Sequence, residues 1–168
     1  MNNNDILRRI RYAFDFNDSK MIAVFALADL EVSREQVSDW LKKDSDPSFQ
    51  ECSDNQLAVF LNGLIFDRRG KKEGVQLEPE QRLNNNIIFR KLKIALDLKA
   101  EDILEILNLS DMSISKHELS AFFRNPDHKH YRDCKDQILR NFLNGVQLKY
   151  RDDTKNGGKS SVGLYRRP

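Results

Sequence analysis

Apolar residues recur at helical spacing along most of the chain. The first such segment predicts a helix over residues 5 to 16, with Asn4 as its N-cap. Its apolar positions fall on one face of that helix: Ile6, Leu7, Ile10, Ala13 and Phe14. No segment shows the sustained alternation of a half-buried strand. The pattern therefore predicts an all-α protein.

Three more helices are predicted before residue 70. An apolar stretch over residues 19 to 29 predicts a central helix. The next helix begins at Ser33, which forms a capping box with Gln36. Leu57, Phe60 and the apolar residues that follow at helical spacing predict a fourth helix over residues 54 to 69.

The sequence aligns to itself without a gap when it is shifted by 82 residues. The alignment gives 19 identities across 68 pairs, including the asparagine triplets 2–4 and 84–86 and the FLNG segments 60–63 and 142–145. This predicts a tandem duplication of a small four-helix, helix-turn-helix-like domain, with repeats at 2–70 and 84–152. Residues 71–83 are expected to form a linker and residues 153–168 a basic flexible tail. Since so short a unit is marginally stable alone, the copies are expected to pack on each other.

Three segments carry a resemblance to a known family. They are NNNDILRRIRYAFD, SREQVSDWLKK and FLNGLIFDRRG with its copy FLNGVQLKYRD. With these segments, residues 2 to 152 resemble the bacterial YehS-type family, a domain-of-unknown-function family built from two such repeats. The second copy departs where Tyr150 and Asp152 stand for an arginine and a glycine. The resemblance implies the duplicated fold and carries no activity with it.

Composition narrows the class of protein. The chain of 168 residues is 39% hydrophobic, with two cysteines and no apolar run that could span a membrane. We therefore expect a soluble cytoplasmic protein without disulfides and without a membrane partner. The net charge of +2 is too balanced to indicate a nucleic-acid-binding protein by itself. However, the net charge is −3 over residues 1–70, +2 over 84–152 and +3 over 153–168.

The second and third helices of each copy resemble a helix-turn-helix, in which the third helix reads the major groove. Glu35 and Asp39 would repel phosphates in copy one. Copy two offers a better set of side chains, namely Lys116, His117, Ser120 and Arg124. The turn before Ser33 is longer than in a standard helix-turn-helix, so a simple packed helical domain is the alternative.

Basic character rises further after this helix. Lys129 and Arg132 belong to the segment HKHYR, and Arg166 and Arg167 belong to the tail. We interpret these four residues as phosphate contacts, with bases stacking on Tyr131 or Tyr165. A solvated loop and a solubilising tail are the alternative. The sequence thus favours a non-enzymatic binding or regulatory adaptor that contacts nucleic acid or a nucleoprotein assembly. The rival function is a protein–protein module or a homodimer.

Asn62-Gly63 and Asn144-Gly145 recur inside the fourth helices. A helical glycine costs about 1 kcal/mol relative to alanine, so both copies retain an unfavourable residue. One explanation is close helix packing at the glycine, with the asparagine bound to a neighbouring backbone. The other is a shared polar site where the copies meet, which would make these four residues part of a repeat interface.

The first helices share a basic cluster. Arg11 precedes Asp15 by four residues and Lys93 precedes Asp97 by four, which predicts a surface ion pair in each copy.

Metal and catalytic motifs are weak. His128, His130 and Cys134 form H-x-H-x3-C, but the equivalent residues of copy one, Asp46, Ser48 and Cys52, do not repeat a ligand set. The segment GGKSS lacks the earlier glycine of a phosphate-binding loop, because position 153 is aspartate. We therefore expect no metal, no cofactor and no enzymatic activity.

Overall fold

The computed structural model describes residues 1–74 and 76–151, which contain eight α-helices, one π-helix and no strand. Copy one consists of α1 (Asn3–Phe14), α2 (Asp18–Leu27), α3 (Arg34–Leu41) and α4 (Asp54–Arg69). Copy two consists of α5 (Asn85–Ala95), α6 (Ala100–Leu109), α7 (Lys116–Ala121) and α8 (Asp136–Val146), and α8 continues as the π-helix η1 (Gln147–Arg151). The predicted tail lies outside the described residues. Among the described helices, none is both long and apolar enough to cross a bilayer.

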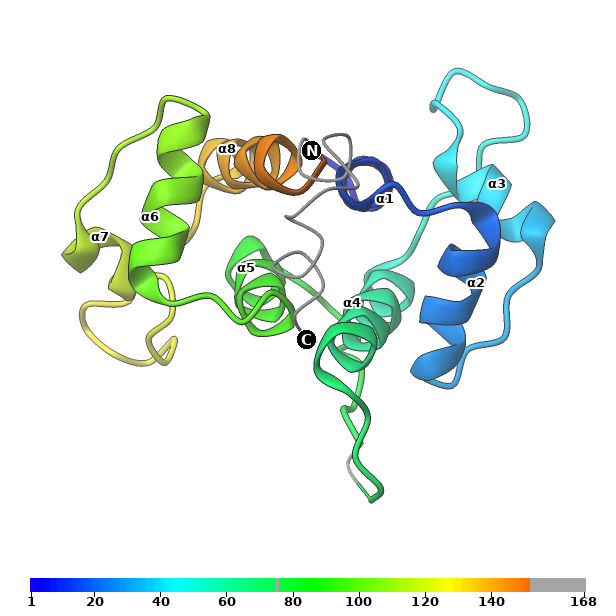
Figure 1. The fold of residues 1–168 in the computed structure, drawn as a ribbon, viewed down its shortest axis with the longest axis horizontal. Helices are drawn as coiled ribbons and strands as arrows, with labels where there is room; N and C mark the ends of the chain where they lie inside the picture. Colours follow the sequence, from blue (N-terminus) through cyan, green and yellow to red (C-terminus); the bar gives the residue numbers. More distant parts are fainter. Residues whose placement is uncertain (75, 152–168) are drawn as a thin grey trace, which may run out of the picture.

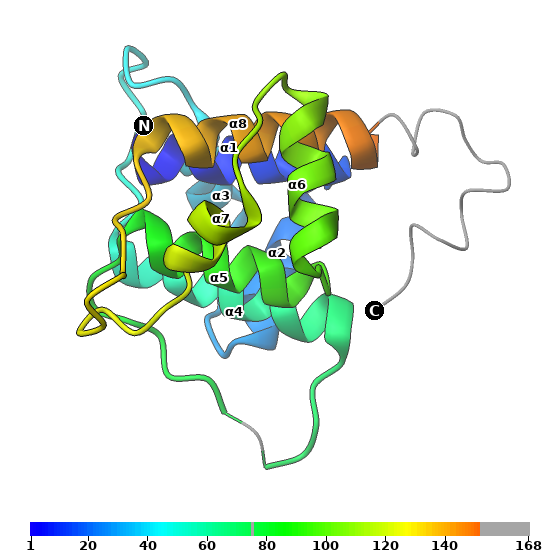
Figure 2. The same ribbon diagram turned by 90° about the vertical axis from the view of Figure 1, so that its left-hand side faces the viewer.

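Four helices, two from each copy, form the centre of the molecule. Figure 1 shows α1 beside α8 and α4 beside α5, with α2 and α3 on one flank and α6 and α7 on the other. Figure 2 shows the same arrangement from the flank of α6, where α1 and α8 run above α5 and α4. The copies therefore meet through equivalent helices, since α1 corresponds to α5 and α4 to α8. The fold is all-helical and duplicated, as the sequence predicts.

The asparagine triplets begin α1 and α5 and hold each copy together. The predicted cap Asn4 is wrong, because α1 begins two residues earlier and Asn2 caps it by accepting from the backbone N–H of Asp5. Asn4 is instead buried at 2% exposure. Its side chain donates to the carbonyls of Trp40 and Gln50 at 2.9 and 2.8 Å and accepts from the N–H of Cys52 at 3.0 Å.

Asn86 repeats this arrangement in copy two. It donates to the carbonyls of Phe122 and Arg132 at 3.0 and 2.8 Å and accepts from the N–H of Cys134 at 2.9 Å. A buried amide with three backbone partners satisfies groups that would otherwise be left unpaired in the core. Each third asparagine therefore fixes the loop that follows the third helix.

Repeated aspartates end the first two helices of each copy. Asp15 and Asp97 follow α1 and α5 with φ of 54° and 53°, and Asp29 and Asp111 follow α2 and α6 with φ of 67° and 61°. Aspartate is among the few residues that tolerate this left-handed conformation. The identity of these residues between copies therefore follows from helix termination.

Gly63 and Gly145 mark the closest helix contacts within each copy. A Cβ built on Gly63 would lie 2.0 Å from the carbonyl oxygen of Val24 in α2. On Gly145 it would lie 2.1 Å from the carbonyl oxygen of Ile106 in α6. No side chain fits at such distances, so both glycines are required for α4 and α8 to approach the second helix of their own copy.

The two cysteines are buried free thiols. Cys52 and Cys134 are each 4% exposed, and burial raises the pKa of both thiols to about 12. A thiolate is the reactive form of cysteine, so neither is reactive in the folded protein.

We therefore expect both cysteines to resist a thiol-specific disulfide reagent at pH 8 and to react fully once the chain is unfolded in denaturant. The release of the reagent's chromophore measures this. Rapid labelling of either cysteine in native protein would contradict the burial. Each single Cys→Ser variant assigns the signal to one copy.

Candidate nucleic-acid interface

The predicted interface lies on α7 and on the loop that joins α7 to α8. Residues 110–115 separate α6 from α7, and residues 28–33 separate α2 from α3. A six-residue turn exceeds the three or four residues of a helix-turn-helix. α7 is also only 6 residues long. The unit therefore differs from a standard helix-turn-helix, and the loop after α7 forms much of the exposed surface.

The loops after α3 and α7 have the same backbone hydrogen bonds. The N–H of Gln50 donates to the carbonyl of Asp39 at 3.2 Å, as the N–H of Arg132 does to Ala121. The Asp46 carboxylate accepts from the N–H of Ser48 at 2.8 Å. In copy two, His128 Nδ1 accepts from the N–H of His130 at 3.0 Å. One backbone shape thus presents two different sets of side chains.

The difference between the two sets is largely one of charge. At equivalent positions, copy one has the residues Glu35, Asp39, Asp46, Pro47, Ser48 and Gln50, and copy two has His117, Ala121, His128, Lys129, His130 and Arg132. At these six positions, three carboxylates of copy one are absent from copy two, which has a lysine, an arginine and three histidines. Elsewhere on the same face, Glu118 and Asp127 stand where copy one has Gln36 and Ser45. All of the copy-two residues of this set except Ala121 are exposed. We call the surface formed by α7 and residues 122–135 the copy-two face.

Three predicted contact residues of the copy-two face have partners. Lys116 Nζ lies 2.9 Å from Glu101 Oε1, and this hydrogen bond raises the pKa of the lysine and lowers that of the glutamate. Both side chains are more than 60% exposed, so the pair is weak and can exchange for a phosphate. Arg124 donates to the carbonyl of His130 at 3.2 Å and to Ser120 Oγ at 3.3 Å.

Lys129 and Arg132 have no side-chain hydrogen bond or ion pair with the rest of the described chain. Arg132 also lines a cleft of about 610 Å³ between α7 and the loop, together with His117 and Tyr131. Burial, followed by the nearby Asp133 carboxylate, raises the pKa of Tyr131, so the phenol stays neutral. The structure therefore brings His117 and Arg132 to one cleft, whereas Arg166 and Arg167 lie outside the described residues.

The asparagines of the fourth helices lie at the boundary between the copies. Lys91 Nζ lies 2.6 Å from Asn62 Oδ1 and 3.0 Å from Glu80 Oε1, and Asn62 is fully buried. At the equivalent position, Arg9 donates to Asn144 Oδ1 at 2.6 Å. At Gly63 and Gly145, the position that a Cβ would occupy instead faces the second helix of the same copy. The asparagine thus reaches the other copy while the neighbouring glycine serves packing within a copy.

The predicted ion pairs within α1 and α5 are wrong. Arg11 donates to the carbonyl of Phe16 at 3.1 Å. Asp15 pairs with Arg151 at 3.4 Å, and Asp97 pairs with Arg69 at 2.5 Å. Asp15 and Asp97 are equivalent, as are Arg69 and Arg151, so both pairs join one copy to the other. The matching of charged residues under the 82-residue shift is the sequence signal for these contacts.

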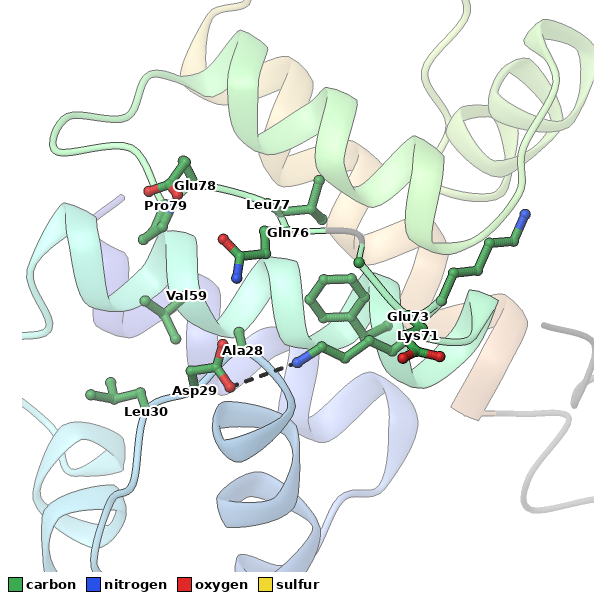
Figure 3. A pocket seen from close by; sticks show the side chains of 13 residues that line it. Ala28, Asp29, Leu30, Val59, Lys71, Glu73, Gln76, Leu77, Glu78 and Pro79 are labelled. Carbon is green, nitrogen blue, oxygen red and sulfur yellow. Dashed lines mark ion pairs between the residues drawn. The ribbon is translucent and has the colours of Figure 1, made fainter.

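A second cleft lies beneath the linker in copy one. This space has a volume of about 630 Å³. Figure 3 shows the residues that line it, with Val59 on α4 and the charged residues Lys71, Glu73 and Glu78 on the linker. Lys71 Nζ donates to the carbonyl of Leu27 at 2.8 Å and lies 3.7 Å from Asp29 Oδ1. Lys71 thereby ties the start of the linker to the end of α2.

Comparison with known proteins agrees with the duplicated architecture. A family described as proteins of unknown function (DUF1456) matches twice, at residues 3–70 and 85–152. The chain belongs to this family. It is also 47% identical over 147 residues to the Uncharacterized protein YehS of Escherichia coli (strain K12), covering 87% of this chain and 94% of that protein. No solved structure matches.

Family membership accounts for the repeated architecture and leaves the chemistry open. The family's description names no reaction, substrate or partner. Within residues 1–74 and 76–151, no group of three or more histidine, cysteine or acidic side chains could hold a metal ion. Of the H-x-H-x3-C residues, Cys134 is buried, and its thiol lies 3.7 Å from the carbonyl of Lys135.

Proposed function

We propose that the protein is a non-enzymatic adaptor that binds nucleic acid, alone or within a nucleoprotein assembly, through the copy-two face. The binding residues are Lys116, His117, Ser120, Arg124, Lys129 and Arg132, with Arg166 and Arg167 of the tail adding charge. Copy one holds the second copy in place through the boundary contacts and does not itself bind nucleic acid.

The charge difference between two equivalent faces carries this proposal. Both loops share their hydrogen bonds, so the change in side chains is not required by the fold. Exposed cations such as Lys129 and Arg132, which have no partner among the described residues, are available to phosphates. Tyr131 and the two histidines beside it supply rings on which bases can stack. The short α7 and its long turn favour contact by the loop over insertion of a recognition helix into a groove.

Fluorescence anisotropy of labelled duplex DNA and single-stranded RNA tests the proposal, with protein titrated at about 50 and 200 mM salt. If four phosphates are contacted, affinity should fall about a hundredfold between these salt concentrations. The double variant Lys116→Glu with Arg124→Glu should abolish binding while circular dichroism shows an unchanged fold. The matched control is Arg34→Glu with Lys42→Glu, at the equivalent positions of copy one, which should bind like the wild type.

Two results would overturn the proposal. One is the absence of binding to either nucleic acid at both salt concentrations, which would favour the rival function of a protein–protein module or homodimer. The other is equal loss of binding in the copy-one and copy-two variants, because a general electrostatic attraction would then explain the data. Deletion of residues 153–168 measures the contribution of the tail separately.

A further inference from the structure

A groove of about 530 Å³ is lined mainly by residues of α1, α8 and η1. The copies meet at α1 and α8 on one side of the central helices and at α4 and α5 on the other (Figure 1). The lining of the groove includes Asp5, Arg8, Arg9, Tyr12, Arg140 and Gln147. Three arginines thus face one carboxylate in a space of the size that holds small ligands. We call this the arginine groove. It is separate from the copy-two face, which shares none of these residues.

The duplication supplies an internal comparison for the arginine groove. The equivalent boundary joins α5 to α4, where Arg140 corresponds to Ala58 and Gln147 to Ile65. Ala58 is fully buried and Ile65 is 9% exposed, so the two helices are packed together there. Asp5 likewise corresponds to Ile87. At these three positions the α4–α5 boundary is therefore apolar and closely packed, whereas the α1–α8 boundary carries polar and basic side chains.

Packing alone does not account for the arginines of the α1–α8 boundary. Arg140 has no hydrogen bond or ion pair with any of the described residues. Arg9 uses one nitrogen on Asn144 Oδ1 and keeps further N–H donors. Arg8 is held in place by the Asp5 carboxylate and by the carbonyl of Lys42 at 2.7 Å. One oriented guanidinium therefore lies beside two with spare donors.

We propose that the arginine groove binds a small molecule that carries a di- or triphosphate group. Guanidinium groups match phosphate oxygens in pairs and are more weakly hydrated than ammonium groups, so convergent arginines favour this chemistry. Arg9 of copy one and Arg140 of copy two bind the phosphate groups, and Arg8 adds a third positive charge to the groove. The ring of Tyr12 is 43% exposed, and the Arg151 guanidinium lies 3.8 Å from its centroid, so the remaining surface of the ring is what contacts the organic part of the ligand.

The position of the groove gives such a ligand a structural effect. Arg9 belongs to α1 of copy one and Arg140 to α8 of copy two, so a bound phosphate bridges the copies. A ligand that binds only the folded state also stabilises it increasingly as its concentration rises. Binding should therefore raise the temperature of unfolding.

Isothermal titration calorimetry of the full chain with inorganic pyrophosphate, inorganic triphosphate and ATP tests this inference, with sulfate at matched ionic strength as a reference. Each phosphate compound should bind saturably and sulfate should not. Arg140→Ala should weaken binding at least tenfold, the usual effect of losing a charge-assisted contact. Because Ala58 occupies the equivalent position of α4, the variant is expected to fold with an unchanged unfolding temperature.

Arg132→Ala on the copy-two face is the matched control and should bind pyrophosphate like the wild type. Conversely, Arg140→Ala should leave oligonucleotide binding unchanged, so the two proposals can fail independently. Absence of binding by all three phosphate compounds would overturn the inference. Equal weakening by Arg132→Ala would also overturn it, as would oligonucleotide binding that depends on Arg140 without any binding of the small phosphates.

Discussion

Gly63→Ala and Gly145→Ala are each expected to destabilise the folded chain by about 3 kcal/mol or more. The added methyl group would lie 2.0 or 2.1 Å from a carbonyl oxygen of the facing helix, which is backbone and cannot rotate away. Helix α4 or α8 must therefore move from its partner and open the core of that copy. Urea unfolding followed by circular dichroism measures the loss as a lower midpoint.

The sign of this effect is diagnostic. Replacing an exposed helical glycine by alanine stabilises a helix by about 1 kcal/mol. A Gly63→Ala variant that is more stable than the wild type would therefore contradict the close approach of α4 to α2. Gly74→Ala in the linker is the control. A Cβ on Gly74 would have no atom within 4 Å, and only the φ of +81° opposes the change. A loss of about 1 kcal/mol is expected there.

Asn86→Ala is expected to destabilise the chain by about 3 kcal/mol and to weaken nucleic-acid binding. The change removes two buried hydrogen bonds and one part-buried hydrogen bond, and it leaves the carbonyls of Phe122 and Arg132 and the N–H of Cys134 without the Asn86 side chain as partner. Buried backbone groups left unpaired cost about 1–3 kcal/mol each, reduced where water can enter. Because the loop held by Asn86 forms much of the copy-two face, loss of these hydrogen bonds also lets its basic side chains move out of position for binding nucleic acid.

Asn4→Ala provides a matched control in the same protein. It removes the equivalent three hydrogen bonds from copy one and should cause a similar loss of stability. Oligonucleotide binding, measured by anisotropy at a temperature where both variants are folded, should weaken for Asn86→Ala and not for Asn4→Ala. Equal weakening in the two variants would show that the effect is global rather than local to the copy-two face.

Much of the fold can be predicted from the sequence because the chain contains its own alignment. The range of α4 and the all-helical class follow from apolar spacing, and the repeats follow from the 82-residue shift. The role of Asn4 cannot be predicted in this way, because an asparagine near the start of a helix can either cap that helix or be buried against another segment. Only the path of the following loop distinguishes the two roles.

The contacts between copies could not be predicted from local spacing. Asp15 lies four residues after Arg11, yet its partner is Arg151, more than a hundred residues away. Local rules rank the nearby partner first, and only packing of the two copies brings the distant one closer. Similarly, the sequence identifies Arg132 and His117 as candidate contacts for nucleic acid. That both line one cleft depends on how α7 lies against the loop, which the sequence does not show.

If side-chain charge on a shared backbone gives the copy-two face its function, an exchange of loop residues should remove that function. The variant His128→Asp, Lys129→Pro, His130→Ser and Arg132→Gln gives copy two the residues of copy one. Since Asp46 and His128 accept the same turn hydrogen bond, the loop is expected to remain folded and the urea midpoint to stay unchanged. This role of charge predicts that the variant, although stable, no longer raises the anisotropy of the labelled oligonucleotide at about 50 mM salt. Retained binding at wild-type affinity would contradict it.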